Sequence, residues 1–217
     1  MRPWIRQLVC GLLGLAAALP ALSAAGESGM LSQMSGTVTY RTADTGPLNA
    51  SVFMKLREGD KLLVPPGASA RVVYFSSGRQ ELWRGPAEFT IGEAASLPAK
   101  GTPQLTQLPV AVGRQFLQSP DLALLARQTR PASVTVRGLK PRPTAEQNAA
   151  VQQARNLYAT MAASAAPDDI TPELYLLAVL MDYALRDEIG KVLDTMQAKQ
   201  PANESIAALR QRLGPAP

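Results

Sequence analysis

The sequence predicts an α+β fold in which an all-β region precedes a C-terminal α-helical hairpin or bundle. Short runs rich in Val, Tyr, Phe and Thr, separated by Gly and Pro turns, occupy the first half of the 217-residue chain, as is typical of all-β units. Ala, Leu and Gln are concentrated in the last third, where apolar residues recur at helical spacing. A proline-containing linker, Leu139 to Thr144, separates the two patterns. We therefore expect a β domain over residues 26–140 and a helical region over residues 141–217.

Residues 1–25 have the features of a secretory signal peptide. Two arginines precede an apolar run from Leu8 to Leu22, and small residues follow it. Cys10 lies inside that run rather than after it, which argues against a lipoprotein anchor. A retained membrane anchor is the alternative, but a span needs about 20 apolar residues, and Pro20 interrupts this run. We expect export to the periplasm, a mature chain that begins near Gly26, and no transmembrane span after signal removal.

Six short runs are expected to form the strands of the β region. Turn signals separate them at intervals of about 8 to 12 residues, as in β-sandwiches and barrels. One run, Ser69 to Phe75, is apolar on both faces and should be the central strand. The predicted strands are Gly36–Tyr40, Ser51–Leu56, Lys61–Val64, Ser69–Phe75, Arg79–Trp83 and Ala87–Ile91.

Turn residues of the β region have structural explanations. Gly59, Gly67 and Gly78 are expected to have positive φ angles in tight turns. Asp60 is expected to bond to the backbone of its own turn. We therefore interpret Asp60 as a turn residue rather than as a catalytic or metal-binding carboxylate.

The order of these elements resembles the FecR domain. A leading strand "GTVTY" (Gly36–Tyr40) precedes "LREGDKLLVPPGASARVVYFSSGRQELWRGPAEF" (Leu56–Phe89), which contains a Leu-x-x-Gly-Asp step, a Pro-Gly-Ala turn and a closing Gly-Pro-Ala-x-Phe strand. The resemblance implies a periplasmic sensor region that answers an outer-membrane transporter and is joined through one transmembrane helix to a cytoplasmic segment that controls a sigma factor. Because a signal sequence stands where that cytoplasmic segment would lie, only the extracytoplasmic module is expected here.

Residues 92–143 carry weaker signals. The stretch "ASLPAKGTPQLTQLP" (Ala95–Pro109) is expected to be an exposed loop. Ser119–Gln128 predicts a short helix with a Ser or Asp cap, and Ala132–Gly138 predicts a further strand that returns to the sheet.

Four helices are expected in the rear region. Thr144 and Gln147 have the spacing of a capping box ahead of the first helix. The expected helices are Ala145–Ala165, Thr171–Leu185, Asp187–Lys199 and a last one between Asn203 and Gly214. A helix pair in this region is similar to one tetratricopeptide-like repeat; the alternative is a plain helical hairpin that packs on itself or on the β region.

Composition excludes most catalytic chemistry. The chain has no histidine, and Cys10 is its only cysteine, which excludes histidine triads, His-liganded metals, thiol nucleophiles and disulfides in the mature chain. Two acidic pairs, Asp168-Asp169 and Asp187-Glu188, stand at expected helix N-termini, where they compensate the helix dipole. No aromatic-basic array suggests nucleic-acid binding. We expect no enzyme activity, no catalytic, metal or cofactor site, and no nucleic-acid partner.

Charge is distributed unevenly along the chain. Gly26–Pro143 carries 14 Lys and Arg against 8 Asp and Glu, whereas Thr144–Pro217 carries 6 against 9. This asymmetry suits docking of one half on the other or affinity for an anionic polymer. A solvated surface of mixed sign is the alternative. We expect the two halves to fold separately and to meet in a modest, salt-sensitive interface.

These observations favour a non-catalytic exported envelope protein that binds a protein partner, as a signalling or assembly accessory. The alternative is a module that binds a cell-wall or anionic polysaccharide through a basic β face containing Arg71, Arg79 and Arg84. We interpret Trp83 and Tyr74 as core or surface-platform residues rather than as a sugar-stacking site.

Overall fold

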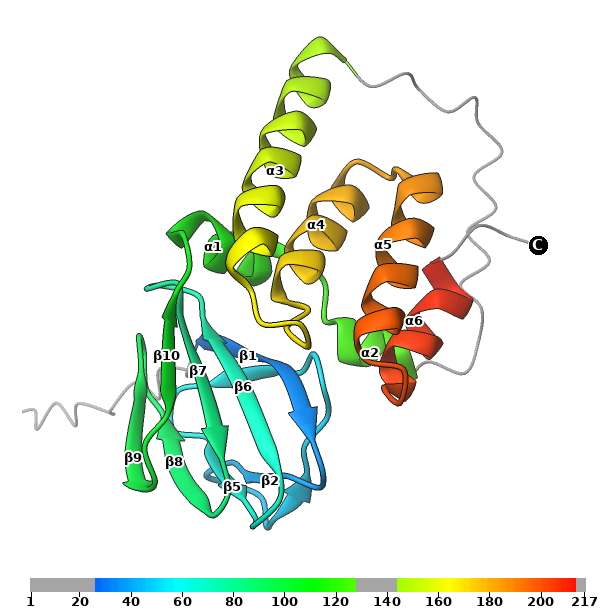
Figure 1. The fold of residues 1–217 in the computed structure, drawn as a ribbon. Helices are drawn as coiled ribbons and strands as arrows, with labels where there is room; N and C mark the ends of the chain where they lie inside the picture. Colours follow the sequence, from blue (N-terminus) through cyan, green and yellow to red (C-terminus); the bar gives the residue numbers. More distant parts are fainter. Residues whose placement is uncertain (1–25, 128–143, 214–217) are drawn as a thin grey trace, which may run out of the picture.

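The computed structural model describes residues 26–127 and 144–213 and has the expected α+β architecture. Ten strands form two antiparallel five-stranded sheets, and the helices gather on one side of them (Figure 1). In order across sheet A the strands are β10 (Gln104–Gln107), β7 (Arg79–Arg84), β6 (Ser69–Tyr74), β1 (Glu27–Ser35) and β4 (Lys55–Arg57). In order across sheet B they are β3 (Leu48–Asn49), β2 (Thr39–Arg41), β5 (Lys61–Val64), β8 (Ala87–Ile91) and β9 (Ser96–Lys100).

Strand β6 is the middle strand of sheet A, as its two apolar faces predict. Val72 and Tyr74 belong to the core between the two sheets. Val73 and Phe75 belong to a second core that contains the helices. Sheet A is therefore the middle layer of three, and this position explains why β6 is buried on both faces.

Several strands differ from those expected. Ala95–Pro109 was expected to be an exposed loop, which is wrong, because β9 and β10 occupy it. Both are edge strands with mostly exposed residues, so they lack the alternation that identifies a half-buried strand. Strand β1 was also missed, and only the end of the predicted strand Ser51–Leu56 is extended. Within that segment Phe53 has a φ of +71°, which is incompatible with a strand.

Six helices complete the described fold. They are α1 (Val110–Gln118), α2 (Leu122–Arg127), α3 (Ala145–Ser164), α4 (Thr171–Asp182), α5 (Arg186–Lys199) and α6 (Glu204–Leu213). The capping box is confirmed, since Gln147 N donates to Thr144 Oγ1 and Thr144 N donates to Gln147 Oε1. Asp121 caps α2 by accepting from Leu124 N. Helix α1 was not predicted, and α4 ends earlier than expected because Ala184 has a φ of +52°.

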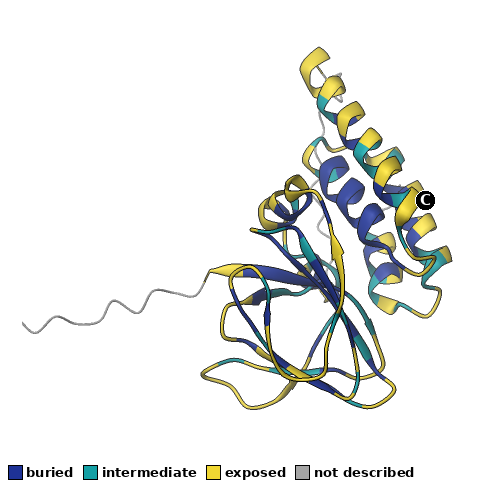
Figure 2. Ribbon diagram, turned by 60° about the vertical axis from the view of Figure 1, so that its left-hand side comes forward, coloured by how far each residue is buried: buried dark blue, intermediate teal, exposed yellow. Residues whose placement is uncertain are grey.

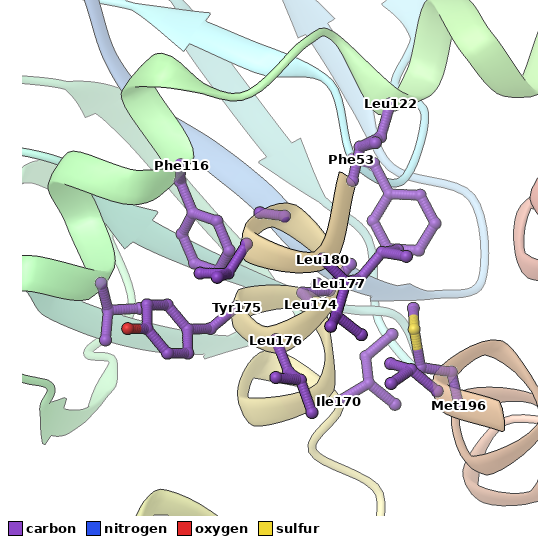
Figure 3. Close-up of a cluster of buried hydrophobic side chains, with 14 of the residues drawn as sticks. Phe53, Phe116, Leu122, Ile170, Leu174, Tyr175, Leu176, Leu177, Leu180 and Met196 are labelled. Atoms are coloured by element: carbon purple, nitrogen blue, oxygen red, sulfur yellow. The ribbon is translucent and has the colours of Figure 1, made fainter. Parts of the chain in front are cut away.

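Helix α4 is buried on all sides (Figure 2). Residues Thr171 to Leu180 are all buried, and α1, α3 and α5 each pack against the helix. Its apolar side chains share one core with Phe53 of the β region and Phe116 of α1 (Figure 3). Helices α4 and α5 thus share one apolar core with the β region. This continuous apolar core contradicts the modest interface expected from the charges.

Several predictions fall on residues that the structure does not describe. These are the signal peptide, the strand Ala132–Gly138 and most of the linker, so the boundary at residue 140 stays a prediction. Over residues 26–127 and 144–213, no helix combines the length and the apolar character needed to cross a membrane.

The expected positive φ angles are confirmed at three glycines: +90° at Gly59, +79° at Gly67 and +67° at Gly78. The surroundings of the last two differ. A Cβ atom at Gly67 would meet nothing within 4 Å, whereas one at Gly78 would lie 2.5 Å from the carbonyl oxygen of Leu108. Backbone strain acts at both positions, and a steric clash acts only at Gly78.

We expect Gly78→Ala to destabilise the protein more than Gly67→Ala. The Gly67 variant should lose roughly 1–2 kcal/mol from backbone strain alone. The Gly78 variant should lose at least about 1 kcal/mol more, because rigid main chain faces the added methyl group. Urea unfolding of both variants gives the comparison, and equal losses would contradict the clash at Gly78.

Candidate functional site

A groove of about 600 Å³ lies between α1 and α3, and α4 contributes its buried floor. Both outer helices pack on α4, and the space between them stays open because the facing side chains are short or polar. The lining residues include Ala111, Gln115 and Gln118 of α1, Ala150, Gln153, Leu157 and Thr160 of α3, and Tyr175, Val179 and Asp182 of α4.

Local sequence patterns position these side chains. On α1, residues 111, 115 and 118 lie on one helical face, and on α3 residues 150, 153, 157 and 160 do the same. The opposite edges of both helices anchor them to the core through Phe116 and Met161. The groove therefore lies between α1 and α3, each of which contributes one face to the core and another to the groove.

The chemistry of the groove is apolar and hydrogen-bonding. Asp182 is the one charged residue among those that line it, and its Oδ2 accepts from Gln115 Nε2 at 2.7 Å. Burial raises the pKa of Tyr175 above its ordinary value. Amide side chains at the rim offer both donors and acceptors. Such a surface suits a protein segment that carries apolar side chains and little charge.

Asp168 and Asp169 form a polar joint between sheet A and the helices. Arg71 is only 3% exposed, and its Nη1 lies 2.8 Å from Asp169 Oδ1. Gln80 Nε2 donates to Asp169 Oδ2 at 2.7 Å, and Gln33 Nε2 donates to Asp168 Oδ2 at 3.0 Å. The acidic pair thus binds three side chains of sheet A.

The same polar joint lies at the N-terminus of helix α4. Thr171 N donates to Asp169 Oδ1 at 2.8 Å, which satisfies one of the free amides at the helix N-terminus. Lys199 of α5 donates to the carbonyl of Asp169 and forms an ion pair with the buried Glu173. Tyr158 donates to Glu173, and burial together with that carboxylate raises the pKa of Tyr158. These contacts give the acidic pair a structural role at the start of α4.

Another buried carboxylate, Glu81, lies between the two sheets. It accepts from Arg79 Nε, Trp83 Nε1 and the backbone N–H of Ser96. The Ser96 hydroxyl bonds to Tyr74 at 2.6 Å, and burial raises the pKa of that tyrosine. All of these groups have partners, so the cluster stabilises the sandwich.

Trp83 and Tyr74 are core residues. Both are fully buried, and the Trp83 ring stacks on Phe89 with centroids 4.2 Å apart. Neither ring is accessible to a sugar, so the surface-platform interpretation does not hold and the core interpretation does.

The three arginines of the expected basic β face do not form one surface. Arg71 lies buried beneath the helices in its ion pair with Asp169. Arg79 bonds to Glu81 at the end of the sandwich, and Arg84 is exposed elsewhere on β7. Alternation along the paired strands places Arg79 on the opposite face of sheet A from Arg71 and Arg84, and of these last two only Arg84 is exposed.

Two further acidic residues, Asp60 and Glu188, also act in the fold. Arg57 N donates to Asp60 Oδ2 at 2.8 Å, which confirms the turn bond expected of Asp60, and burial raises the pKa of this carboxyl. Glu188 in the first turn of α5 forms an ion pair with Arg155 of α3. Within residues 26–127 and 144–213, no three ligand-type residues gather closely enough to hold a metal ion.

Comparisons with family models, curated proteins and solved structures find no match to this chain. Functional inference therefore rests on the residues described above.

Sequence reasoning missed the α1 wall of the groove. Val112 and Phe116 lie four residues apart and are fully buried, which is the spacing of an amphipathic helix. That signal was present in the sequence, but Gly113 weakened it. Gly113 is required there because a Cβ atom would meet the main chain of Phe75, the residue after β6.

Proposed function

We propose that this chain is a non-catalytic exported envelope protein that binds a partner protein in the periplasm as a signalling or assembly accessory. The groove between α1 and α3 is its binding surface. The partner contributes a segment with apolar side chains that lies on Tyr175 and Val179. Amides of Gln115 and Gln153 hydrogen-bond to the backbone of that segment.

The apolar residues on the floor of the groove, Tyr175 and Val179, carry this proposal. Exposed helical surfaces are normally covered with charged side chains, and uncharged apolar concavities are typical of binding sites. Ala111 and Ala150 on opposite walls keep the groove open, because longer side chains at these positions would fill it.

We further propose that the β region is a FecR-like module. Support comes from the turns of the motif, which lie between strands in the expected order: Gly59 precedes β5, Gly67 precedes β6 and Gly78 precedes β7. In this proposal the rigid sandwich holds α1 and α4 in place, since both pack against the β region.

The substitution Ala150→Arg tests the groove, and Ala149→Arg is its matched control. Ala150 is half-buried in the groove wall, whereas Ala149 is exposed one position along the same helix. Periplasmic extract passed over immobilised wild-type chain should yield a retained protein. We expect the Ala150 variant to retain about tenfold less of it and the Ala149 variant to retain as much as wild type.

Thermal unfolding of the two variants provides the control for folding. Both substitutions replace alanine by another good helix former, so similar stability is expected. Equal retention by the two variants, or no protein retained by wild type, would contradict binding in the groove.

A further inference from the structure

Within residues 26–127 and 144–213, strand β10 has a neighbouring strand on one side only and forms an edge of sheet A. All four of its residues, Gln104 to Gln107, are exposed, and Leu105 is 56% exposed. Its other side pairs with β7 in an antiparallel ladder. A free edge presents a row of unpaired backbone donors and acceptors, to which another strand can add.

The other three sheet edges are protected against strand addition. Strand β9 contains Pro98 and Lys100, and β3 has only two residues. Strand β4 contains two basic residues, and Lys55 Nζ bonds to the carbonyl of Leu117 from α1. Proline, lysine and short strands are the usual means of blocking an edge. Strand β10, with the sequence Gln-Leu-Thr-Gln, contains neither proline nor a charged residue and is longer than β3.

The hydrogen-bond pattern shows which backbone groups of β10 point outward. Leu108 N donates to the carbonyl of Gly78 at 2.9 Å. Hydrogen-bonded pairs alternate along an antiparallel ladder, so Thr106 and Gln104 bond inward to Gln80 and Leu82. The N–H and C=O groups of the other two residues, Leu105 and Gln107, therefore point away from the sheet.

This pattern is complementary to itself. When two β10 strands meet antiparallel about a two-fold axis at Thr106, Leu105 of each copy faces Gln107 of the other. Both of these residues carry outward backbone groups, so they form the hydrogen-bonded pairs. Thr106 then faces its own copy in a non-hydrogen-bonded pair, as the ladder requires. No charge lies on the strand to oppose a second identical one.

We propose that two copies of this chain associate through β10 to form a two-fold symmetric dimer with a continuous ten-stranded sheet. The interface joins sheet A of each copy and covers Leu105. A closed two-fold contact uses the same edge on both copies, so it ends the assembly at two. The groove between α1 and α3 lies outside β10, and this proposal is independent of partner binding there.

A charge exchange at Thr106 tests the dimer by analytical ultracentrifugation of the purified exported chain. The short edge predicts weak association, with a dissociation constant on the order of 1–100 µM for wild type. Thr106→Lys and Thr106→Glu each place like charges opposite each other, and each should weaken self-association at least about tenfold. An equimolar mixture of the two variants should form dimers again, because opposite charges then meet.

Thr45→Lys is the matched control, since Thr45 is exposed in a loop outside the strands. It should associate as wild type does. A wild-type chain that remains monomeric at about 1 mM overturns the proposal. A dimer that tolerates Thr106→Lys, or variants whose mixture fails to associate, overturns it as well.

Discussion

Residues 26–143 produced without the helical region should fail to fold cooperatively. The apolar face of sheet A would then keep only the cover that α1 and α2 provide, because α4 and α5 supply much of that core. The residues that share this core with α4 and α5 include Met30, Phe53, Val73, Phe75 and Phe116, all of which are buried in the whole chain. Exposed apolar surface of this kind promotes aggregation.

Circular dichroism and dye binding measure this outcome. The fragment should bind a hydrophobic dye and unfold without a cooperative transition, whereas the whole chain should show a single one. Adding residues 144–217 as a separate chain should restore cooperative unfolding. A fragment with a β spectrum and a sharp transition would instead support the independent folding expected from the sequence.

Breaking the buried ion pair between Arg71 and Asp169 should destabilise the protein by about 3–5 kcal/mol. Asp169→Asn leaves the buried Arg71 guanidinium with only the more distant carboxylate of Asp168, whose Oδ1 lies 3.9 Å from Arg71 Nη2. Arg71→Met leaves the buried Asp169 carboxylate without its guanidinium partner. The double variant should lose less than the sum of the two single losses, because neither buried charge is then left unpaired.

Arg155→Met is the control for this cycle. Its pair with Glu188 is 40% and 38% exposed in the two side chains, so its loss should change the free energy of unfolding by less than about 1 kcal/mol. Chemical unfolding of all four variants provides the comparison. Because a buried pair is weakly screened, added salt should hardly change the loss of unfolding free energy caused by Arg71→Met. A strong salt dependence would support the charge-led interface expected from the sequence.

The strands that could be predicted are those with strong turn signals at their ends. Gly67, Gly78 and the Gly85-Pro86 pair separate β6, β7 and β8, and the structure has each strand within one residue of its expected bounds. The backbone geometry of these turns requires glycine or proline, so the turns can be predicted from the sequence alone.

The elements that could not be predicted take their stability from distant partners. Strand β1 contains Ser, Gly, Gln and Met rather than β-branched residues, and its place between β4 and β6 compensates for this low propensity. Strand β10 has no buried face, and so its sequence carries no alternating pattern.

Local sequence patterns could predict neither the groove nor the polar joint. The groove combines α1 with α3, two helices separated by the segment that the structure does not describe. Arg71 was expected on an exposed β face. Alternation along a strand predicts which residues share a face, but it does not predict which other element covers that face. Asp169 was assigned to the start of a helix correctly, but its pairing with Arg71 depends on tertiary contacts alone.

The all-round burial of α4 also has a consequence for the order in which the chain assembles. A helix of twelve residues is marginal in isolation, and one without a polar face gains nothing by forming in water. Its partners in the core include Met30, far earlier in the chain, so the contacts that stabilise it close a long loop and form slowly. Until residues 171–182 are available, the apolar face of sheet A stays exposed, and we expect this interval to be the stage at which a newly made chain most needs a chaperone.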